Sequence, residues 1–298
     1  MGAGDRRGLL RELCERDVRL LRIVRSWRPD VMAAIGGIFI AHAGLLSRAR
    51  SLVFYDTENA RLQNALTYPF AGRVIVPRCY AAWTPRRRTL RYPGYHELSY
   101  LRPPHFNPDR TIALANGLSV ERPTYLLRLV SWRASHDVGE LGLTWDAVRR
   151  AGARLQAAGA HVLISSEAEL PADLQPHAYA GDTAQIHHVM GHCAGFFGES
   201  ATMASECAVL GVPAVYAAHT GRGYTDEQEM RYGLVKNVRT LDPAALDDGI
   251  EWLLGFAAED ARRRRQRLLD DTCDVAEFVV RAIETRGELG GGRNGQSG

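Results

Sequence analysis

Lysine is almost absent from this sequence: of its 37 basic residues only Lys236 is a lysine, and all the others are arginines. This bias is typical of a codon composition rather than of a chemical function. The basic residues face 34 acidic ones, which leaves a formal net charge of +3. Arginine runs at 86–88 and 262–265 could touch nucleic acid or anionic lipid, but no nucleic-acid-binding motif accompanies them. We expect solvated faces there, and no nucleic-acid partner.

Cysteine is also scarce, and the five cysteines show no C-x-x-C spacing. Their pattern disfavours both a disulfide scaffold and a zinc site, and it is typical of reduced thiols in a cytosolic protein. We also expect no metal ion and no bound cofactor.

Long hydrophobic runs are missing as well. The longest extends from Val31 to Leu46, contains His42 and three glycines, and falls short of the roughly 20 residues that span a bilayer. The charged N-terminal region has no apolar stretch of the signal-peptide kind. These features predict a cytoplasmic location, with peripheral association at the inner face of the membrane as an alternative.

What the sequence does contain is an alternation of short apolar stretches with helical patterns. Its 298 residues are 46% hydrophobic, enough for a sizeable core and, at about 100–200 residues per domain, for two domains. The alternation predicts parallel sheets with helices on both faces, an α/β class of two Rossmann-like, doubly wound domains. The predicted strands are 31–35, 52–55, 74–76, 125–130, 161–164, 195–197 and 214–216. The predicted helices are 5–27, 38–48, 62–69, 144–158, 186–190 and 202–210, with mostly helix from 242 to 286.

Residues 84–108 interrupt this alternation with five prolines, and we interpret them as a connection between domains. We expect an N-terminal domain at 1–115, a C-terminal domain at 116–288 and a disordered tail at 289–298. The first domain opens on a helix where a nucleotide-binding half normally opens on a strand and a glycine turn. We therefore expect this domain to be shortened at its start.

The stretch from Glu199 to Pro213 carries the most specific signal. A strand ends at small residues, and a helix begins near Ser200, Ala201 and Thr202, where free N–H groups and the helix dipole favour an anion. Glu206 follows about one turn later, where a carboxylate can accept hydrogen bonds from ribose hydroxyls. The alternative is an ordinary strand–helix–strand unit with an exposed glutamate.

A second polar stretch, Ser131 to Gly139, directly follows a predicted strand. In open α/β sheets, ligands bind at the carboxyl ends of the strands. Arg133 could hold a phosphate through two N–H groups, and His136 could donate to an anion or act as an acid. In the alternative interpretation this is a polar loop in which Ser135 or Asp137 caps a helix.

Acidic side chains also follow a strand of the first domain, at Asp56, Glu58 and Asn59. Carboxylates at this edge can deprotonate an acceptor hydroxyl, although Asp56 could equally cap a helix. Gly36 and Gly37 follow the preceding strand and complete this set of candidates. The pair His187-His188 lacks metal-ligand spacing, because adjacent histidines at a helix start point in different directions.

Taken together, these segments resemble the prokaryotic family known as domain of unknown function 354, which is similar to GT-B-fold glycosyltransferases and to non-hydrolysing UDP-N-acetylglucosamine 2-epimerases. The resemblance covers roughly residues 8–285. The segments that carry it are Trp27–Val31, Tyr55–Glu58, Tyr95–Leu98, Phe106–Asp109, Ser131–Gly139, Ile164–Glu167, Ile186–His188 and Glu199–Pro213.

This resemblance implies a GT-B architecture with a nucleotide-sugar cleft between the domains. A T-x-x-x-E-x-x-x-x-G-x-P pattern, matched by Thr202, Glu206, Gly211 and Pro213, would place Glu206 at the ribose. Residues Glu199 to Ala201 would then lie at the diphosphate. Ser131, Arg133, Ser135 and His136 would form a phosphate loop, and Asp56, Glu58 and Asn59 would lie on the acceptor side.

Three functional hypotheses follow. The first is a nucleotide-diphosphate-sugar-dependent glycosyltransferase, inverting and metal-independent, with Asp56 or Glu58 as base and a glycan or lipid-linked acceptor. The second is a sugar-nucleotide 2-epimerase, in which His136, Asp56 and Glu58 supply acid and base. The third is a truncated, non-catalytic nucleotide-sugar-binding protein. The sequence specifies neither the sugar, the base nor the oligomeric state.

Overall fold

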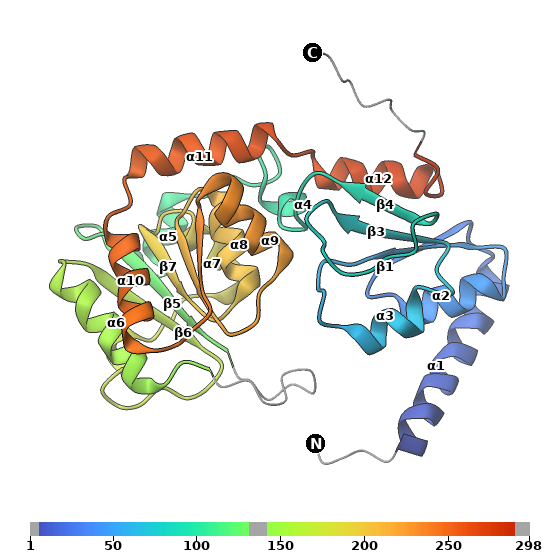
Figure 1. Cartoon of the computed structure of the whole chain (residues 1–298), viewed down its shortest axis with the longest axis horizontal. Helices are drawn as coiled ribbons and strands as arrows, with labels where there is room; N and C mark the ends of the chain where they lie inside the picture. Colours follow the sequence, from blue (N-terminus) through green and yellow to red (C-terminus); the bar gives the residue numbers. More distant parts are fainter. Residues whose placement is uncertain (1–5, 131–141, 290–298) are drawn as a thin grey trace. The chain divides into compact units, whose positions relative to one another are not determined.

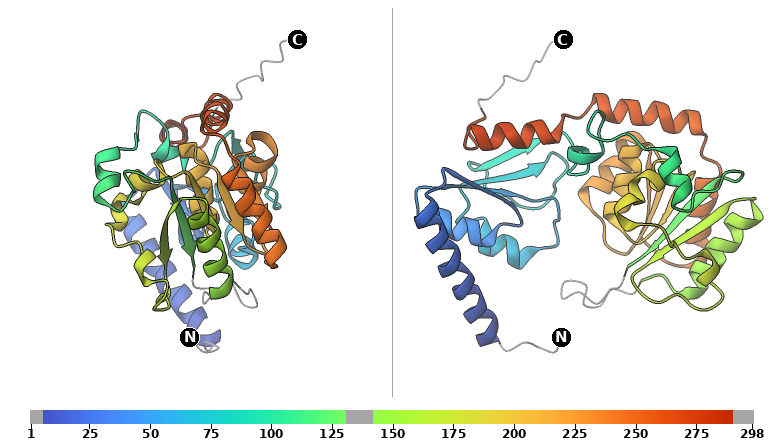
Figure 2. Two further views of the ribbon diagram at one scale, coloured as in Figure 1. Left: turned by 90° about the vertical axis from the view of Figure 1, so that its left-hand side faces the viewer. Right: turned by 180° about the vertical axis from the view of Figure 1, so that it is seen from behind.

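A computed structural model describes residues 6–130 and 142–289, which form two compact units. One unit contains the chain up to Pro93 together with the residues from Val275 onward, and the other extends from Gly94 to Asp274. Each unit is a sheet covered by helices (Figures 1 and 2). This division differs from the predicted domains 1–115 and 116–288, because residues 94–115 join the second unit and the last helix joins the first.

The first unit is built on four parallel strands in the order β1-β2-β3-β4. Its strands are β1 (Val31–Ile35), β2 (Arg50–Phe54), β3 (Arg73–Pro77) and β4 (Thr89–Tyr92). Its helices are α1 (Arg6–Trp27), α2 (Ile38–Leu45), α3 (Arg61–Thr67) and α12 (Val275–Glu284). Because all four strands run the same way, their carboxyl ends lie along one edge of the sheet.

Both faces of this sheet are covered, which explains the continuous apolar character of its central strands. Val53 in β2 and Val74 and Ile75 in β3 have no exposed surface. Helices α2 and α3 lie on one face and α12 on the other (Figure 1). In α12, the ring of Phe278 lies 5.1 Å from that of Tyr92, so the last helix belongs to the first unit despite its place in the sequence.

The second unit has five parallel strands in the order β6-β5-β7-β8-β9. The chain builds β6 on one side of β5 and then β7, β8 and β9 on the other, which is a doubly wound order with its switch point between β5 and β7. The strands are β5 (Thr124–Leu129), β6 (His161–Ser166), β7 (Gly195–Gly198), β8 (Ala214–Ala217) and β9 (Val235–Val238).

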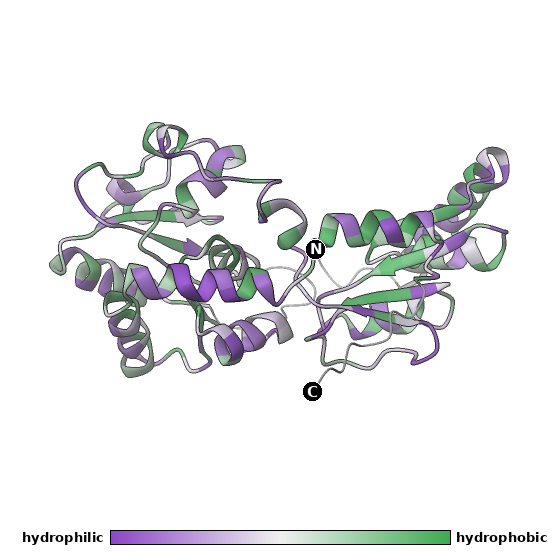
Figure 3. Cartoon of the chain, turned by 90° about the horizontal axis from the view of Figure 1, so that it is seen from above, coloured by the Kyte–Doolittle hydropathy of each residue, from purple (hydrophilic) through white to green (hydrophobic). Residues whose placement is uncertain are grey.

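Helices cover both faces of this second sheet. They are α4 (Leu98–Leu101), α5 (Arg110–Ala115), α6 (Trp145–Ala157), α7 (Ile186–Met190), α8 (Ala201–Leu210), α9 (Gly223–Glu227), α10 (Pro243–Leu254) and α11 (Ala258–Asp270). Helices α6 and α10 pack on one core of this unit, where Leu155 and Ile250 are fully buried. The strands of both sheets are largely hydrophobic, whereas the helices mix hydrophobic and hydrophilic residues (Figure 3).

The segment 84–108, interpreted from its prolines as a connection, contains β4 and α4. It therefore supplies the edge strand of one unit and the first helix of the other, and the boundary at Pro93–Gly94 lies inside it. In the parts of the chain that the structure describes, no helix is long and apolar enough to cross a membrane.

Candidate functional site

The switch point of the second sheet brings together the ends of β5 and β7. Glu199 directly follows β7, and Ser200, Ala201 and Thr202 begin α8. Gly198 allows the two strands to approach, because a Cβ atom there would lie 2.3 Å from the carbonyl oxygen of Arg128. In doubly wound sheets this is the place where ligands bind.

Helix α8 begins and ends as its sequence predicts. The Oγ of Ser200 accepts a hydrogen bond from the N–H of Met203 at 3.2 Å, and Gly211 closes the helix with a left-handed backbone at φ 84°. The first turn, whose N–H groups have no partner within the helix and whose end carries a partial positive charge, therefore lies at the switch point. An anion would be stabilised there.

The carboxylate of Glu199 accepts hydrogen bonds from backbone N–H groups that precede and follow residues 131–141 in the sequence. The residue is 4% exposed, and its Oε2 accepts from the N–H of Val130 at 3.0 Å, while its Oε1 accepts from the N–H of Leu143. These two bonds join the end of β5 to the residues that precede α6. The contact with a diphosphate that the sequence predicts for Glu199 stays a prediction, and its described contacts are structural.

Glu206 lies in the second turn of α8 and is 7% exposed, so the alternative of an exposed glutamate is wrong. Its Oε1 accepts a hydrogen bond from the hydroxyl of Tyr100 in α4 at 2.9 Å. The same oxygen lies 3.0 Å from Nε2 of His187 in α7. The carboxylate is thus held by two side chains from different elements, which fixes its orientation.

The two adjacent histidines point toward different partners, as predicted. His187 faces Glu206, with its ring 5.8 Å from that of Tyr100. His188 accepts a hydrogen bond from the N–H of Asp109 on its Nδ1 at 2.9 Å. Within residues 6–130 and 142–289, no cluster of three or more His, Cys, Asp or Glu side chains is arranged to hold a metal ion.

The carboxyl edge of the first sheet brings its predicted residues together. Gly36 follows β1 with φ +66°, and its carbonyl accepts from Nε2 of Gln63 at 2.9 Å. Gly37 precedes α2, and residues 56–59 follow the neighbouring strand β2. The positive φ of Gly36 is a backbone conformation that residues with a side chain rarely adopt, so this turn favours glycine.

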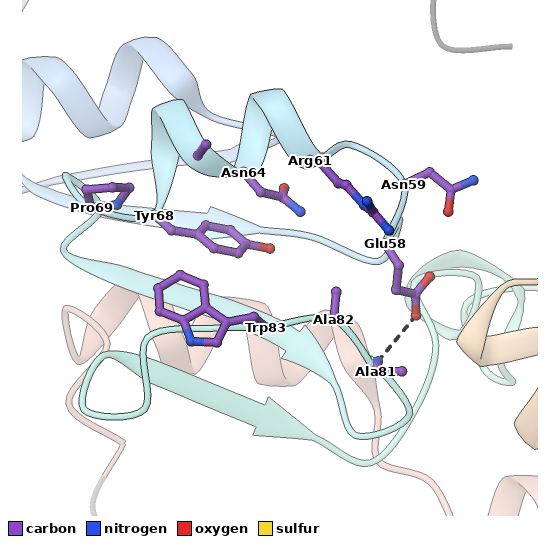
Figure 4. Close-up of a pocket in the computed structure, with 10 residues that line it drawn as sticks. Glu58, Asn59, Arg61, Asn64, Tyr68, Pro69, Ala81, Ala82 and Trp83 are labelled. Atoms are coloured by element: carbon purple, nitrogen blue, oxygen red, sulfur yellow. Dashed lines mark hydrogen bonds between the residues drawn. The ribbon is translucent and has the colours of Figure 1, made fainter. Parts of the chain in front are cut away.

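The acidic residues of this edge have partners in their own unit. Oδ1 of Asp56 accepts from the hydroxyl of Thr57 at 2.9 Å, and Oε1 of Glu58 accepts from the N–H of Ala81 at 3.4 Å. Glu58 and Asn59 also line a hollow of about 650 Å³ between α3 and the loop after β3 (Figure 4). Two predicted residues thus share one pocket.

Four predicted residues, Ser131, Arg133, Ser135 and His136, lie outside the residues that the structure describes, and their roles stay predictions. Sequence reasoning missed the partners of Glu206, Tyr100 and His187. It also missed the aromatic wall of the pocket, formed by Tyr68 and Trp83. For Tyr100 and Trp83, the available signal was the concentration of aromatic residues in and just before the proline-rich segment, which its prolines alone indicate to be a connection.

No family model and no curated protein matches the chain. Solved structures do match over most of its length. A UDP-N-acetylglucosamine 2-epimerase from Listeria monocytogenes has a TM-score of 0.62 at 12% identity, covering 92% of this chain and 79% of that one. The UDP-GlcNAc 2-epimerase from Neisseria meningitidis, bound to UDP-GlcNAc, has a TM-score of 0.61 at 10% identity, covering 91% and 80%.

A glycosyltransferase also matches: SnogD from Streptomyces nogalater has a TM-score of 0.52 at 14% identity, covering 90% of this chain and 75% of that one. At these identities the likeness concerns the fold. The sheets, their parallel strands and these neighbours agree with the predicted class. The chain has the two-unit, Rossmann-like α/β fold of GT-B glycosyltransferases and UDP-N-acetylglucosamine 2-epimerases.

Proposed function

We propose that the chain is a nucleotide-diphosphate-sugar-dependent glycosyltransferase that transfers a sugar to a hydroxyl acceptor with inversion and without a metal ion. Support comes from the fold, which is shared with glycosyltransferases and with an epimerase solved with UDP-GlcNAc bound. Fold alone does not define chemistry, so the proposal depends on the residues at the switch point.

The observation that carries the proposal is the arrangement around Glu206. A carboxylate offers about four lone-pair directions, and the two donors, Tyr100 and His187, both use Oε1. We therefore assign Oε2 to the two vicinal hydroxyls of a ribose. A carboxylate that is already oriented loses little conformational freedom on binding, which favours affinity.

The diphosphate would then lie at the start of α8, near Ser200, Ala201 and Thr202. Negative charge grows on the diphosphate as its bond to the sugar breaks, and amide donors at a helix start stabilise such charge. Arg133, Ser135 and His136 are our candidates for further donors, and Ser131, in the same stretch of sequence, is another. These assignments complete the leaving-group side of the reaction.

On the acceptor side, Asp56 or Glu58 would act as general base. The base takes the proton of the acceptor hydroxyl, whose oxygen forms a bond to the anomeric carbon. The bond from that carbon to the diphosphate breaks, and its electron pair leaves with the diphosphate. Attack from the side opposite the leaving group inverts the anomeric centre, and the nucleoside diphosphate is released.

A thermal-shift panel of UDP, dTDP, GDP, CDP and ADP tests the donor site. A ligand at 100 times its dissociation constant adds about 2.7 kcal/mol, and for units of this size each kcal/mol raises the midpoint by roughly 2–4 °C. We expect one diphosphate to stabilise the protein and Glu206→Ala to abolish that shift. An unchanged shift in the variant would contradict the ribose assignment.

Turnover separates the proposed transfer from the epimerase alternative. A transferase releases nucleoside diphosphate only when an acceptor is present. Conversion of UDP-N-acetylglucosamine alone to its manno epimer would instead identify an epimerase, and binding without turnover under any acceptor would identify a non-catalytic protein.

A further inference from the structure

The hollow in the first unit differs in character along its length. It lies between α3 and the loop that joins β3 to β4, with aromatic and apolar side chains at one end and polar side chains at the other (Figure 4). Its volume of about 650 Å³ is in the range of small-molecule sites. The lining residues that matter here are Glu58, Asn59, Arg61, Asn64, Tyr68 and Trp83.

Trp83 provides an exposed apolar platform that borders this hollow and a second, smaller one. Its side chain is 72% exposed, which is unusual for an indole, while the neighbouring Tyr68 is buried. The two ring centroids are 6.2 Å apart and the planes meet at 39°. A flat aromatic ligand sandwiched between two rings needs parallel walls about 7–8 Å apart, at ordinary contact distances of 3.5–4.0 Å on each side. This geometry favours a ligand that stacks on a single face.

At the polar end, Asn64 presents an acceptor that lacks a partner. The residue is 9% exposed, its Nδ2 donates to the hydroxyl of Tyr80 at 3.1 Å, and its Oδ1 is buried without a hydrogen bond. Buried acceptors are nearly always satisfied, so a small shift of the Asn64 side chain that brings Oδ1 to a ligand donor in the hollow would be favoured. Asn59, Arg61 and Glu58 lie at the same end and add amide, guanidinium and carboxylate groups (Figure 4).

The loop that carries Trp83 is held in place by its own unit. Arg91 in β4 donates to the carbonyl of Tyr80 at 2.7 Å and to that of Arg78 at 3.2 Å. Glu58 accepts from the N–H of Ala81 at the same loop. A platform on a fixed loop is preorganised, and binding to it therefore costs little ordering.

We propose that this hollow binds a pyranose ring of a carbohydrate acceptor, with a C–H face of the ring on the indole of Trp83 and its hydroxyls at Asn64 and the polar end. A pyranose has one apolar face and a rim of donors, which matches a single open ring beside an unsatisfied acceptor. A planar aromatic ligand would find no second parallel ring to stack on, and an alkyl chain would bring no donor for Oδ1 of Asn64. The proposal rests on the proposed transferase function, and it makes the acceptor a glycan.

Saturation-transfer NMR with maltose, cellobiose and chitobiose, recorded without nucleotide, tests this assignment. We expect saturation on the ring C–H protons of at least one disaccharide, and binding weakened about tenfold or more by Trp83→Ala. Trp27→Ala is the matched control, because Trp27 is also strongly exposed in the same unit, at 82%, and it should leave binding unchanged. Trp83→Phe should retain part of the affinity, since a ring remains.

Absence of saturation with all three sugars would overturn the proposal, and so would equal binding by the Trp83→Ala variant. Binding of phenol or of an octyl chain that depends on Trp83, with no sugar bound, would also overturn it. The test is independent of Glu206. Sugar binding without a nucleotide shift would leave this pocket assignment standing and refute the transferase, and the reverse result would refute only the pocket.

Discussion

Replacing Glu199 by glutamine should destabilise the second unit strongly, although the change removes no bulk. The two carboxylate oxygens accept backbone N–H groups, Oε2 from Val130 and Oε1 from Leu143. Glutamine keeps one oxygen and replaces the second by an NH₂ group, which then faces an N–H donor. The variant therefore loses one charge-assisted hydrogen bond and leaves a buried amide unsatisfied.

The magnitude follows from these two losses. A hydrogen bond to a charged group contributes about 1.5–3 kcal/mol, and an unsatisfied buried donor costs about 1–3 kcal/mol. Because Glu199 is 4% exposed, little water can replace the lost partner. These two figures count partly the same loss, so we expect Glu199→Gln to lower the free energy of unfolding by about 2–4 kcal/mol and the thermal midpoint by roughly 5–15 °C.

Urea denaturation and calorimetry measure this effect, and Glu167→Gln is the control. Glu167 pairs with Arg128 at 2.6 Å but its side chain is 46% exposed, and such surface pairs contribute about 0–1 kcal/mol. If Glu199→Gln is no more destabilising than the control, Glu199 does not hold the two backbone segments and the reasoning is refuted.

Three further predictions concern stability and reactivity. Gly211→Ala should cost about 1–2 kcal/mol in urea denaturation, because φ 84° is left-handed, and a result near zero would contradict that geometry. Arg150 lowers the pKa of Asp247 to about 2, so the Arg150–Asp247 pair stabilises the fold fully at pH values above the ordinary aspartate pKa. This stabilisation is lost as pH falls through about 2, so the drop in thermal midpoint on acidification should be smaller in Asp247→Asn than in wild type. Burial raises the pKa of Cys193 to about 12, so mass spectrometry after brief iodoacetamide treatment of native protein should find Cys14 labelled and Cys193 unlabelled.

The sequence predicts best those helices and strands that have start and stop signals in the residues beside them. Strand β7, helix α8 and strand β8 follow from a capping serine, a closing glycine and a proline, all within 20 residues. Strands β1, β2 and β3 follow from apolar runs. The sequence also predicts the helical end of the chain, which forms α10, α11 and α12.

Elements without such signals are missed. Strands β4 and β9 are four residues long and carry few apolar side chains, and α4 lies among prolines. Contacts between residues that are far apart in the sequence cannot be predicted from a single sequence either. The C-terminal residues are held on the first unit by contacts such as that of Arg73 with Gly287, which follows α12 and lies 214 residues away in the sequence. The domain boundary follows from this packing rather than from composition.

The candidate site shows the same limit. The motif points to Glu206, but nothing local predicts that Tyr100, 106 residues earlier, donates to its carboxylate. For Glu199, the sequence suggests a ligand contact because the residue follows β7, but the contacts in the structure are with the protein backbone.

Isothermal titration of the preferred nucleoside diphosphate tests the central claim most directly, using wild type, Glu206→Gln and Glu227→Gln. Glu227 is a matched control, because its Oε2 accepts from Tyr95 at 2.8 Å much as Glu206 accepts from Tyr100, within the same unit. The account predicts affinity about tenfold or more weaker in Glu206→Gln and unchanged in Glu227→Gln. Equal affinity in all three proteins, or no binding by wild type, would contradict a nucleotide site at α8.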